Sequence, residues 1–162
     1  MRSSRKVSRR RFLAIITTAA VSISFGLWNV LPAHAVTSRM TIGSGLASCP
    51  SGYVCLWTLS NFTGSGYAFF NSETNYAGLP APFNGIQDNS WSFYNNGATS
   101  DIEFYRDANY SGGSFVLCKG QSIAALPPNS SINPPTLRSD GTNEPGRPWR
   151  DQISSHHFGT WC

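Results

Sequence analysis

Few side chains in this sequence have the types and the spacing that catalysis requires. The chain holds no nucleophile elbow, no His-Glu-x-x-His zinc motif and no glycine-rich phosphate loop. Beyond residue 35 it has two histidines, His156 and His157, and adjacent residues on a strand point to opposite faces. A group of Ser154, His157 and Asp88 would have to assemble by chance, and histidines at the surface or at a strand end are the simpler interpretation. The sequence therefore predicts a protein that is not an enzyme.

The first 35 residues have the pattern of an export signal. Residues 8–13 read Ser-Arg-Arg-Arg-Phe-Leu, which matches the twin-arginine motif, and an apolar run continues to Leu31. Residues 33–35 read Ala-His-Ala, which is a signal-peptidase site. A membrane anchor is the alternative, but Ser, Thr, Gly and Asn dilute the run and the cleavage site follows it directly. We expect a secreted, extracellular protein that begins at Val36 and has no membrane contact after cleavage.

Removal of this signal changes the charge of the protein. The full chain has 12 basic and 8 acidic residues and a formal charge of +4, but six of the basic residues lie before residue 12. The 127 residues that remain carry six basic and eight acidic side chains, which gives −2. Without a basic stripe we expect no nucleic-acid partner, and the aromatic residues are better interpreted as core. A chain of this length is one domain.

All four cysteines, Cys49, Cys55, Cys118 and Cys162, lie in the mature chain. Export to an oxidising compartment makes two disulfides the expected state, and three pairings are possible. Pro50 and Gly52 make a turn between the first two cysteines, which favours Cys49 with Cys55 and leaves Cys118 with Cys162. A zinc site is the alternative, but Cys-x5-Cys without a second close pair does not fit the usual ligand spacing.

One pattern, aromatic-x4-aromatic-x-Gly, occurs twice with an offset of 48 residues. Residues 57–64 read Trp-Thr-Leu-Ser-Asn-Phe-Thr-Gly, and residues 105–112 read Tyr-Arg-Asp-Ala-Asn-Tyr-Ser-Gly. The pattern predicts a strand, a tight turn and a second strand, with two aromatic side chains folded over the hairpin. The glycine takes a backbone conformation that side chains disfavour. These signature residues are Trp57, Phe62, Gly64, Tyr105, Tyr110 and Gly112.

The other runs of the mature chain indicate an all-β fold. Stretches rich in aromatic and β-branched residues occur at 54–57, 67–70, 91–94, 102–105 and 114–117, separated by Gly, Asn, Ser and Pro. No window of helical length has an apolar stripe without a breaker. Residues 36–48 are small and polar without a clear period, and we expect them to form a flexible N-terminal arm.

The doubled pattern, followed in each half by an Asp/Asn…Ser segment, resembles the Greek-key motif of the βγ-crystallins. With Cys-Pro-x-Gly-x-x-Cys at residues 49–55 and an export signal, the chain is similar to the secreted bacterial peptidase inhibitors of the streptomycete metalloproteinase inhibitor family. The resemblance covers residues 49–162. It implies a βγ-crystallin-like sandwich of two Greek-key motifs, one at about 49–97 and one at about 98–162.

The same resemblance implies an inhibitor of extracellular proteases, chiefly metalloproteases, so the expected partner is such a protease and the expected state is a monomer. Crystallin-type domains also serve in other ways, because a fold does not fix a function. One alternative is a calcium-binding or structural module without inhibitory activity. Another is a toxin-like or glycan-binding secreted protein.

Calcium binding is implied by the oxygen-rich segment that each crystallin half can carry. Here the segments are residues 88–93, Asp-Asn-Ser-Trp-Ser-Phe, and residues 150–155, Arg-Asp-Gln-Ile-Ser-Ser. Carboxylate, amide and hydroxyl oxygens suit this cation, although the same groups often cap strand ends. The candidate ligands are Asp88, Asn89, Ser92, Asp151 and Ser154. Because Arg150 places a positive charge beside Asp151, we expect no required cofactor and at most one weak Ca²⁺.

The second half of the repeat is longer than the first by about 15 residues, which fall within residues 127–150. This stretch holds six of the ten prolines, so we expect an extended surface loop. Such a loop can enter a protease cleft, and a Cys118–Cys162 disulfide around its base would lower the ordering cost of binding. Thermolysin-type proteases prefer a bulky apolar residue after the cut, which makes Ile132 and Leu137 the candidate inhibitory residues. A flexible insertion without a partner is the alternative.

Overall fold

The computed structural model describes residues 37–126 and 149–162. The chain divides into two units, Met1–His34 and Ala35–Cys162, and all described residues belong to the second. The export signal expected at residues 1–35 lies outside the described residues. Within the described ranges, no helix is long and apolar enough to cross a membrane.

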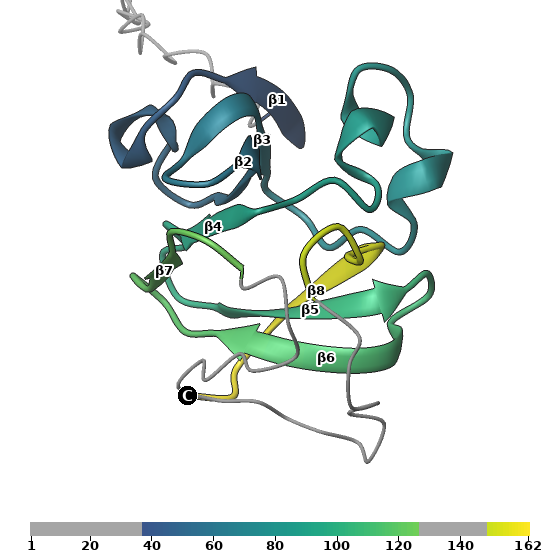
Figure 1. The fold of residues 1–162 in the computed structure, drawn as a ribbon. Coiled ribbons are helices and arrows are strands. Elements are labelled where there is room, and N and C mark those ends of the chain that lie inside the picture. The colour runs from purple at the N-terminus through teal and green to yellow at the C-terminus, as the bar shows by residue number, and fades with distance from the viewer. Residues whose placement is uncertain (1–36, 127–148) are drawn as a thin grey trace, which may run out of the picture. The chain divides into compact units, whose positions relative to one another are not determined.

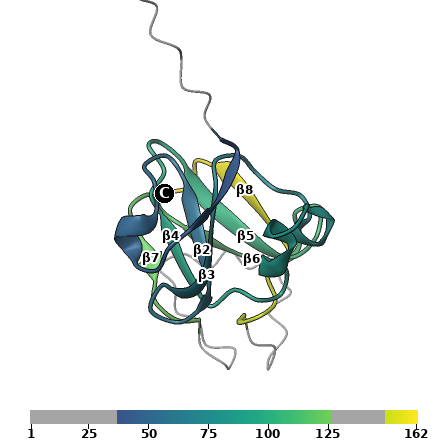
Figure 2. The same cartoon turned by 90° about the horizontal axis from the view of Figure 1, so that it is seen from above.

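Strands dominate the described residues, as the sequence predicts. The helical elements are 3-10 turns of three or four residues, and Figure 2 shows them on opposite sides of the strands. In chain order the elements are β1 (Arg39–Ile42), η1 (Leu46–Ser48), β2 (Val54–Leu59), β3 (Thr63–Phe69), η2 (Tyr76–Gly78), η3 (Phe83–Ile86), β4 (Ser92–Asn95), β5 (Asp101–Asp107), β6 (Ser111–Leu117), β7 (Ser122–Ile123) and β8 (Ser155–Gly159).

These strands form two antiparallel sheets (Figure 1). The larger sheet has the order β1-β3-β2-β4-β7, and the smaller has the order β6-β5-β8. Alternate residues on the strands share one face, so each sheet presents an apolar face to the other. Phe93 of β4 and Phe104 of β5 have ring centroids 4.9 Å apart, and Phe104 stacks on Phe115 of β6 at 5.1 Å. Both sheets therefore contribute to one core.

In each half of the chain, one segment pairs with a strand in the sheet of the other half. The short strand β7 follows the second hairpin but pairs with β4 in the larger sheet. In return, Glu73 follows the first hairpin and makes a β-bridge with His156 on β8 of the smaller sheet. This return of the chain to the opposite sheet is the Greek-key connection, and the two-motif crystallin-like sandwich expected from the sequence is confirmed.

The two repeated hairpins have the same geometry. Asn61 and Phe62 have positive φ angles of 55° and 60°, and Asn109 and Tyr110 have 60° and 57°. The ring of Trp57 packs edge-on against that of Phe62 at 5.4 Å, and Tyr105 lies 5.6 Å from Tyr110. At Gly64 and Gly112, with φ of 79° and 75°, a Cβ would lie 2.5 Å from a side-chain oxygen of the preceding strand, which explains the glycines.

Residues 39–48 are not the flexible arm expected from the sequence. Arg39–Ile42 form strand β1, which pairs with β3 in register from Arg39–Phe69 to Ile42–Gly66. Met40 and Ile42 pack against a second apolar cluster around the buried Trp57. The prediction was wrong because a four-residue strand beside Ser and Gly has little periodicity, and its stability comes from pairing with a distant strand.

Candidate functional site

Two buried serines define how the halves of the chain correspond. The Ser92 hydroxyl donates to the Leu59 carbonyl at 2.7 Å and accepts from the Phe62 amide at 3.0 Å. The Ser155 hydroxyl donates to the Asp107 carbonyl at 2.7 Å and accepts from the Tyr110 amide at 3.3 Å. Because Ser92 closes its hairpin in this way, its oxygen is committed, and we remove Ser92 from the candidate calcium ligands.

This correspondence corrects the alignment of the two oxygen-rich segments by one residue. Ser92 and Ser155 are 63 positions apart, which is 15 more than the repeat offset and confirms the size of the insertion. Asp88 therefore matches Asp151, and both have positive φ, 47° and 57°. The sequence comparison had aligned Asp88 with Arg150, and counting backward from the strand would have avoided the shift. In the corrected register Gln87 matches Arg150, and Trp91 matches Ser154.

The first of two polar clusters consists of Gln87, Asp88 and Ser154. Its side-chain hydrogen bonds connect the two motifs. Gln87 Nε2 donates to Ser154 Oγ at 2.8 Å, and Ser154 Oγ donates to Asp88 Oδ1 at 3.2 Å. Gln87 Oε1 is buried and has no hydrogen-bond partner among the described residues. The Asn89 side chain does not join them, since it donates to the Gly85 carbonyl at 3.0 Å. A carboxylate, a hydroxyl and an unsatisfied amide oxygen fit one weak calcium ion, which would tie the motifs together.

The second cluster consists of Trp91, Arg150 and Asp151. In it an indole N–H and a guanidinium surround the carboxylate, at the positions that match Ser154 and Gln87 of the first cluster. Trp91 Nε1 donates to Asp151 Oδ1 at 2.7 Å. The Arg150 guanidinium lies 4.0 Å above the Trp91 ring, and its Nε is 3.7 Å from Asp151 Oδ2. The indole N–H of Trp91 and the positive charge of Arg150 therefore lie next to the Asp151 carboxylate, and they disfavour the binding of a cation there. The residues of the second cluster do not fit calcium, which removes Asp151 from the candidate ligands.

The two ends of the insertion contact two neighbouring residues, Ser90 and Trp91. The Leu126 amide donates to the Trp91 carbonyl at 2.8 Å, and the Asp151 amide approaches the Ser90 carbonyl at 3.5 Å. Leu126 and Trp149 are both 2% exposed. Trp149 packs edge-on against Phe115 at 5.2 Å. Ile132 and Leu137 lie outside the described residues.

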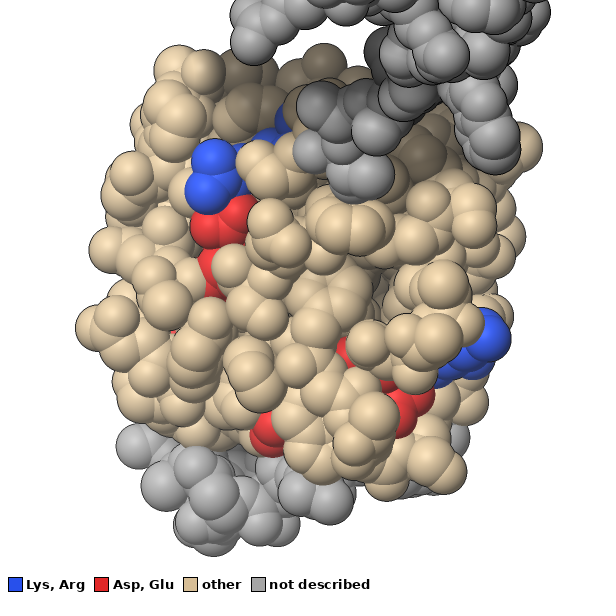
Figure 3. Space-filling model, turned by 180° about the vertical axis from the view of Figure 1, so that it is seen from behind, with Lys and Arg blue, Asp and Glu red and all other residues tan. Residues whose placement is uncertain are grey.

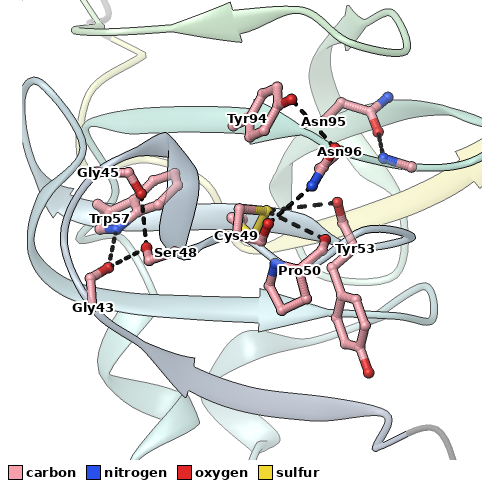
Figure 4. Close-up of a disulfide and its surroundings, with 12 residues drawn as sticks. Gly43, Gly45, Ser48, Cys49, Pro50, Tyr53, Trp57, Tyr94, Asn95 and Asn96 are labelled. Atoms are coloured by element: carbon pink, nitrogen blue, oxygen red, sulfur yellow. Dashed lines mark hydrogen bonds between the residues drawn. A yellow bond between two sulfur atoms is a disulfide. The ribbon is translucent and has the colours of Figure 1, made fainter.

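Both expected disulfides are present, and among the described residues no cysteine is free. Cys49 is bonded to Cys55, and the Asn96 side chain donates to the Cys49 carbonyl at 2.9 Å (Figure 4). Cys118 is bonded to Cys162 at the C-terminus. The sulfur atoms are therefore not available as metal ligands, although Asp101 lies beside the second pair.

Asp101 fixes the chain terminus around the second disulfide. Its Oδ1 accepts from the Lys119 amide at 3.1 Å, and its Oδ2 accepts from the amides of Trp161 at 2.7 Å and Cys162 at 2.8 Å. Burial alone would raise the pKa of Asp101, but the three N–H donors outweigh it and lower the pKa below its usual value. The ionised carboxylate thus stabilises the segment that carries Cys162.

The histidines do not form a catalytic group. His156 is fully buried, contrary to the expectation of a surface or strand-end residue, and burial lowers its pKa to about 3. Its Nε2 donates to the Asn71 carbonyl at 3.0 Å, so Nδ1 accepts from the Tyr76 hydroxyl at 2.6 Å. The His157 ring packs between Tyr110 and Trp161, whereas Ser154 bonds Asp88. The group of Ser154, His157 and Asp88 does not assemble.

Charged side chains on the face in Figure 3 are few, and blue and red groups lie next to each other without forming a basic stripe. Arg39 and Glu73 form a bidentate ion pair, in which Arg39 Nη2 donates to Glu73 Oε2 at 3.1 Å. This face agrees with the expectation that the aromatic residues serve the core.

Residues 44–117 match the model of peptidase inhibitor family I36. No curated protein matches the chain. A structure from work on the evolution of the eye lens βγ-crystallin domain fold is similar, with a TM-score of 0.52 and 19% identity over 77% of this chain and 100% of that one. Spherulin 3a from Physarum polycephalum has a TM-score of 0.45 and 18% identity, covering 76% of this chain and 98% of its own. A βγ-crystallin from Ciona intestinalis has a TM-score of 0.44 and 16% identity, covering 65% and 98%.

The structural likeness shows the fold, and the sequence match covers both repeated hairpins. A peptidase inhibitor acts by binding a protease. The chain therefore has a βγ-crystallin fold, and its residues 44–117 have the sequence pattern of peptidase inhibitor family I36, a family of inhibitors rather than enzymes.

Proposed function

We propose that the protein inhibits extracellular metalloproteases and that residues 127–150 form the inhibitory segment. The observation that carries this proposal is the attachment of both ends of the segment to Ser90 and Trp91, by the amides of Leu126 and Asp151. A segment whose ends are held loses less conformational freedom on binding than a free one. The disulfide between Cys118 and Cys162 adds a covalent restraint around the same stretch.

Metalloproteases are proposed as targets because of the side chains in the segment. Enzymes of the thermolysin type prefer a bulky apolar residue after the cut, and Ile132 and Leu137 are the residues of that kind between Leu126 and Trp149. The prolines restrict the backbone of this stretch and favour an extended form. Such a form suits the narrow cleft of a protease.

The direct test is titration of the mature protein against a panel of extracellular metalloproteases and serine proteases. We expect inhibition of a metalloprotease and none of the serine enzymes. A chain shortened within residues 130–143 should keep its melting temperature near that of the wild type and lose inhibition. The double variant Ile132→Ala and Leu137→Ala should weaken inhibition by at least tenfold. Unchanged inhibition by the shortened chain would move the reactive segment to a hairpin, residues 61–66 or 109–113.

Weak calcium binding is the second candidate function. It is favoured by one observation, the buried and unsatisfied Gln87 Oε1 beside Asp88 and Ser154. These three residues would hold the ion, and Ser154 comes from the other half of the chain. The ion would then supply a link between the motifs and no chemistry of its own.

We also propose that the protein is exported and acts as a monomer outside the cell. Two disulfides are consistent with an oxidising compartment, and a protease inhibitor of this kind meets its targets there. The twin-arginine pattern and the Ala-His-Ala site at residues 33–35 support export.

A further inference from the structure

Trp91 makes three contacts that converge on the base of the insertion. Its carbonyl accepts from the Leu126 amide at 2.8 Å, just before the insertion begins. Its indole N–H donates to Asp151 Oδ1 at 2.7 Å, just after the insertion ends. Its ring lies under the Arg150 guanidinium at 4.0 Å, and its neighbour Ser90 accepts from the Asp151 amide. Trp91, just before strand β4, therefore contacts one end of the insertion through its backbone carbonyl and the other end through its side chain.

The position that matches Trp91 in the other half of the chain is Ser154, which has a much smaller side chain. At the matching position Ser154 makes a small hydroxyl link to Gln87 and Asp88, and no insertion interrupts the chain between the matching residues of the first half. At the matching place in the second cluster lie the indole of Trp91, from the first half, and the guanidinium of Arg150, from the second half. Aromatic and guanidinium groups attract each other through the ring quadrupole, more strongly where water is partly excluded. Arg150 has a side chain 32% exposed, so this attraction is only partly screened.

We propose that Trp91, with Arg150 and Asp151, is a metal-free clasp that sets the two ends of the insertion side by side, and that Trp91 is the positioning residue for inhibition. The inference rests on the proposed function of the insertion. The three residues, called here the Trp91 clasp, do not contact the protease. They act through the chain that they hold, by restricting the directions in which it leaves the sheet.

The test uses full mature protein with Trp91→Ser and Trp91→Phe. Trp91→Ser removes the ring and the indole N–H, whereas Trp91→Phe keeps a smaller aromatic ring beside Arg150 and removes the N–H. The matched control is Trp161, which is also half-buried and whose ring lies 5.7 Å from that of His157. Trp161→Ser and Trp161→Phe remove equivalent groups away from the insertion. Two readouts are measured for each variant: the inhibition constant, and hydrogen exchange of the Leu126 and Asp151 amides.

We expect Trp91→Ser to raise the inhibition constant about tenfold and to speed exchange at both amides at least tenfold. Trp91→Phe should give intermediate values, and the Trp161 variants should leave both readouts within twofold of the wild type. Unchanged exchange at both amides in Trp91→Ser would overturn the clasp, whatever the inhibition constant does. Faster exchange with unchanged inhibition would overturn the positioning role. If wild-type protein inhibits no protease, the proposed function fails, and the exchange readout still decides whether the clasp exists.

Discussion

His156 shows how a single buried residue makes the stability of this protein depend on pH. Its ring is fully buried between the two sheets, where a charge would be poorly solvated. Burial therefore lowers the pKa of His156 to about 3, and the charge of the neighbouring His157 acts in the same direction. The hydrogen bond to the Asn71 carbonyl opposes this shift but is outweighed. In the unfolded chain the same imidazole would titrate near its ordinary pKa of 6.5.

We predict that stability falls as the pH falls from 6.5 toward 3. In that range the unfolded chain binds a proton that the folded chain does not, so lower pH favours unfolding, by about 2 kcal/mol at pH 5. Denaturant unfolding at several pH values measures the slope. His156→Gln should destabilise the protein at pH 7 and flatten the slope. His157→Gln, the matched control, should leave it intact, and an equal slope in both variants would contradict the assignment.

The hairpin serines allow a second prediction at this scale. Replacing Ser92 or Ser155 by Ala leaves a carbonyl and an amide of one hairpin without a partner, and each change should lower the free energy of unfolding by about 1–3 kcal/mol. Ser111→Ala is the control, because that hydroxyl is exposed and bonds the Ala108 carbonyl within its own turn. Its effect should stay below about 0.5 kcal/mol. Losses equal to that of Ser111→Ala would count against the role of the two buried hydroxyls.

At the scale of elements, the hairpins could be predicted from sequence and the shorter strands could not. The spacing of Trp57, Phe62 and Gly64 is local turn chemistry, so it appears in the sequence itself. β1 and β7 have four and two residues and exist because distant strands pair with them. The same distinction between local patterns and distant contacts applies to the candidate functional site. The disulfides were predictable from cysteine spacing, whereas the contact of Trp91 with Asp151 depends on the meeting of two halves.

Calcium binding is predicted for the first cluster only. We expect at most one site, with a dissociation constant no tighter than roughly 10⁻⁴ to 10⁻³ M. At ten times that concentration of calcium the gain would be RT ln 11, about 1.4 kcal/mol, which raises the melting temperature measurably. Asp88→Asn should abolish the rise, and Asp151→Asn at the matching position should leave it unchanged. Calorimetric titration that finds two sites, or a loss of binding in Asp151→Asn, would refute the assignment to the first cluster.

For the whole molecule, the two disulfides and the export signal expected at residues 1–35 predict one processed form. Mass spectrometry of secreted protein should find an N-terminus at Val36 and no free thiol, since both cysteine pairs are bonded. Asp101→Asn should weaken the hold on Trp161 and Cys162 and make the second disulfide easier to reduce than the first. An uncleaved chain in the membrane fraction, or thiols that react without denaturation, would contradict this picture.

The crossing of β7 into the larger sheet and of Glu73 to β8 also bears on how such a chain could have arisen. Two similar halves suggest duplication of a shorter gene, yet a single half would lack the partner for its third segment. The ancestral product could complete its sheet only by exchanging that segment with a second copy, as a two-fold symmetric homodimer. Within one chain the two halves need not stay identical. The hydroxyl of Ser154 lies in the interface between them, whereas the matching position holds Trp91, beside the long insertion.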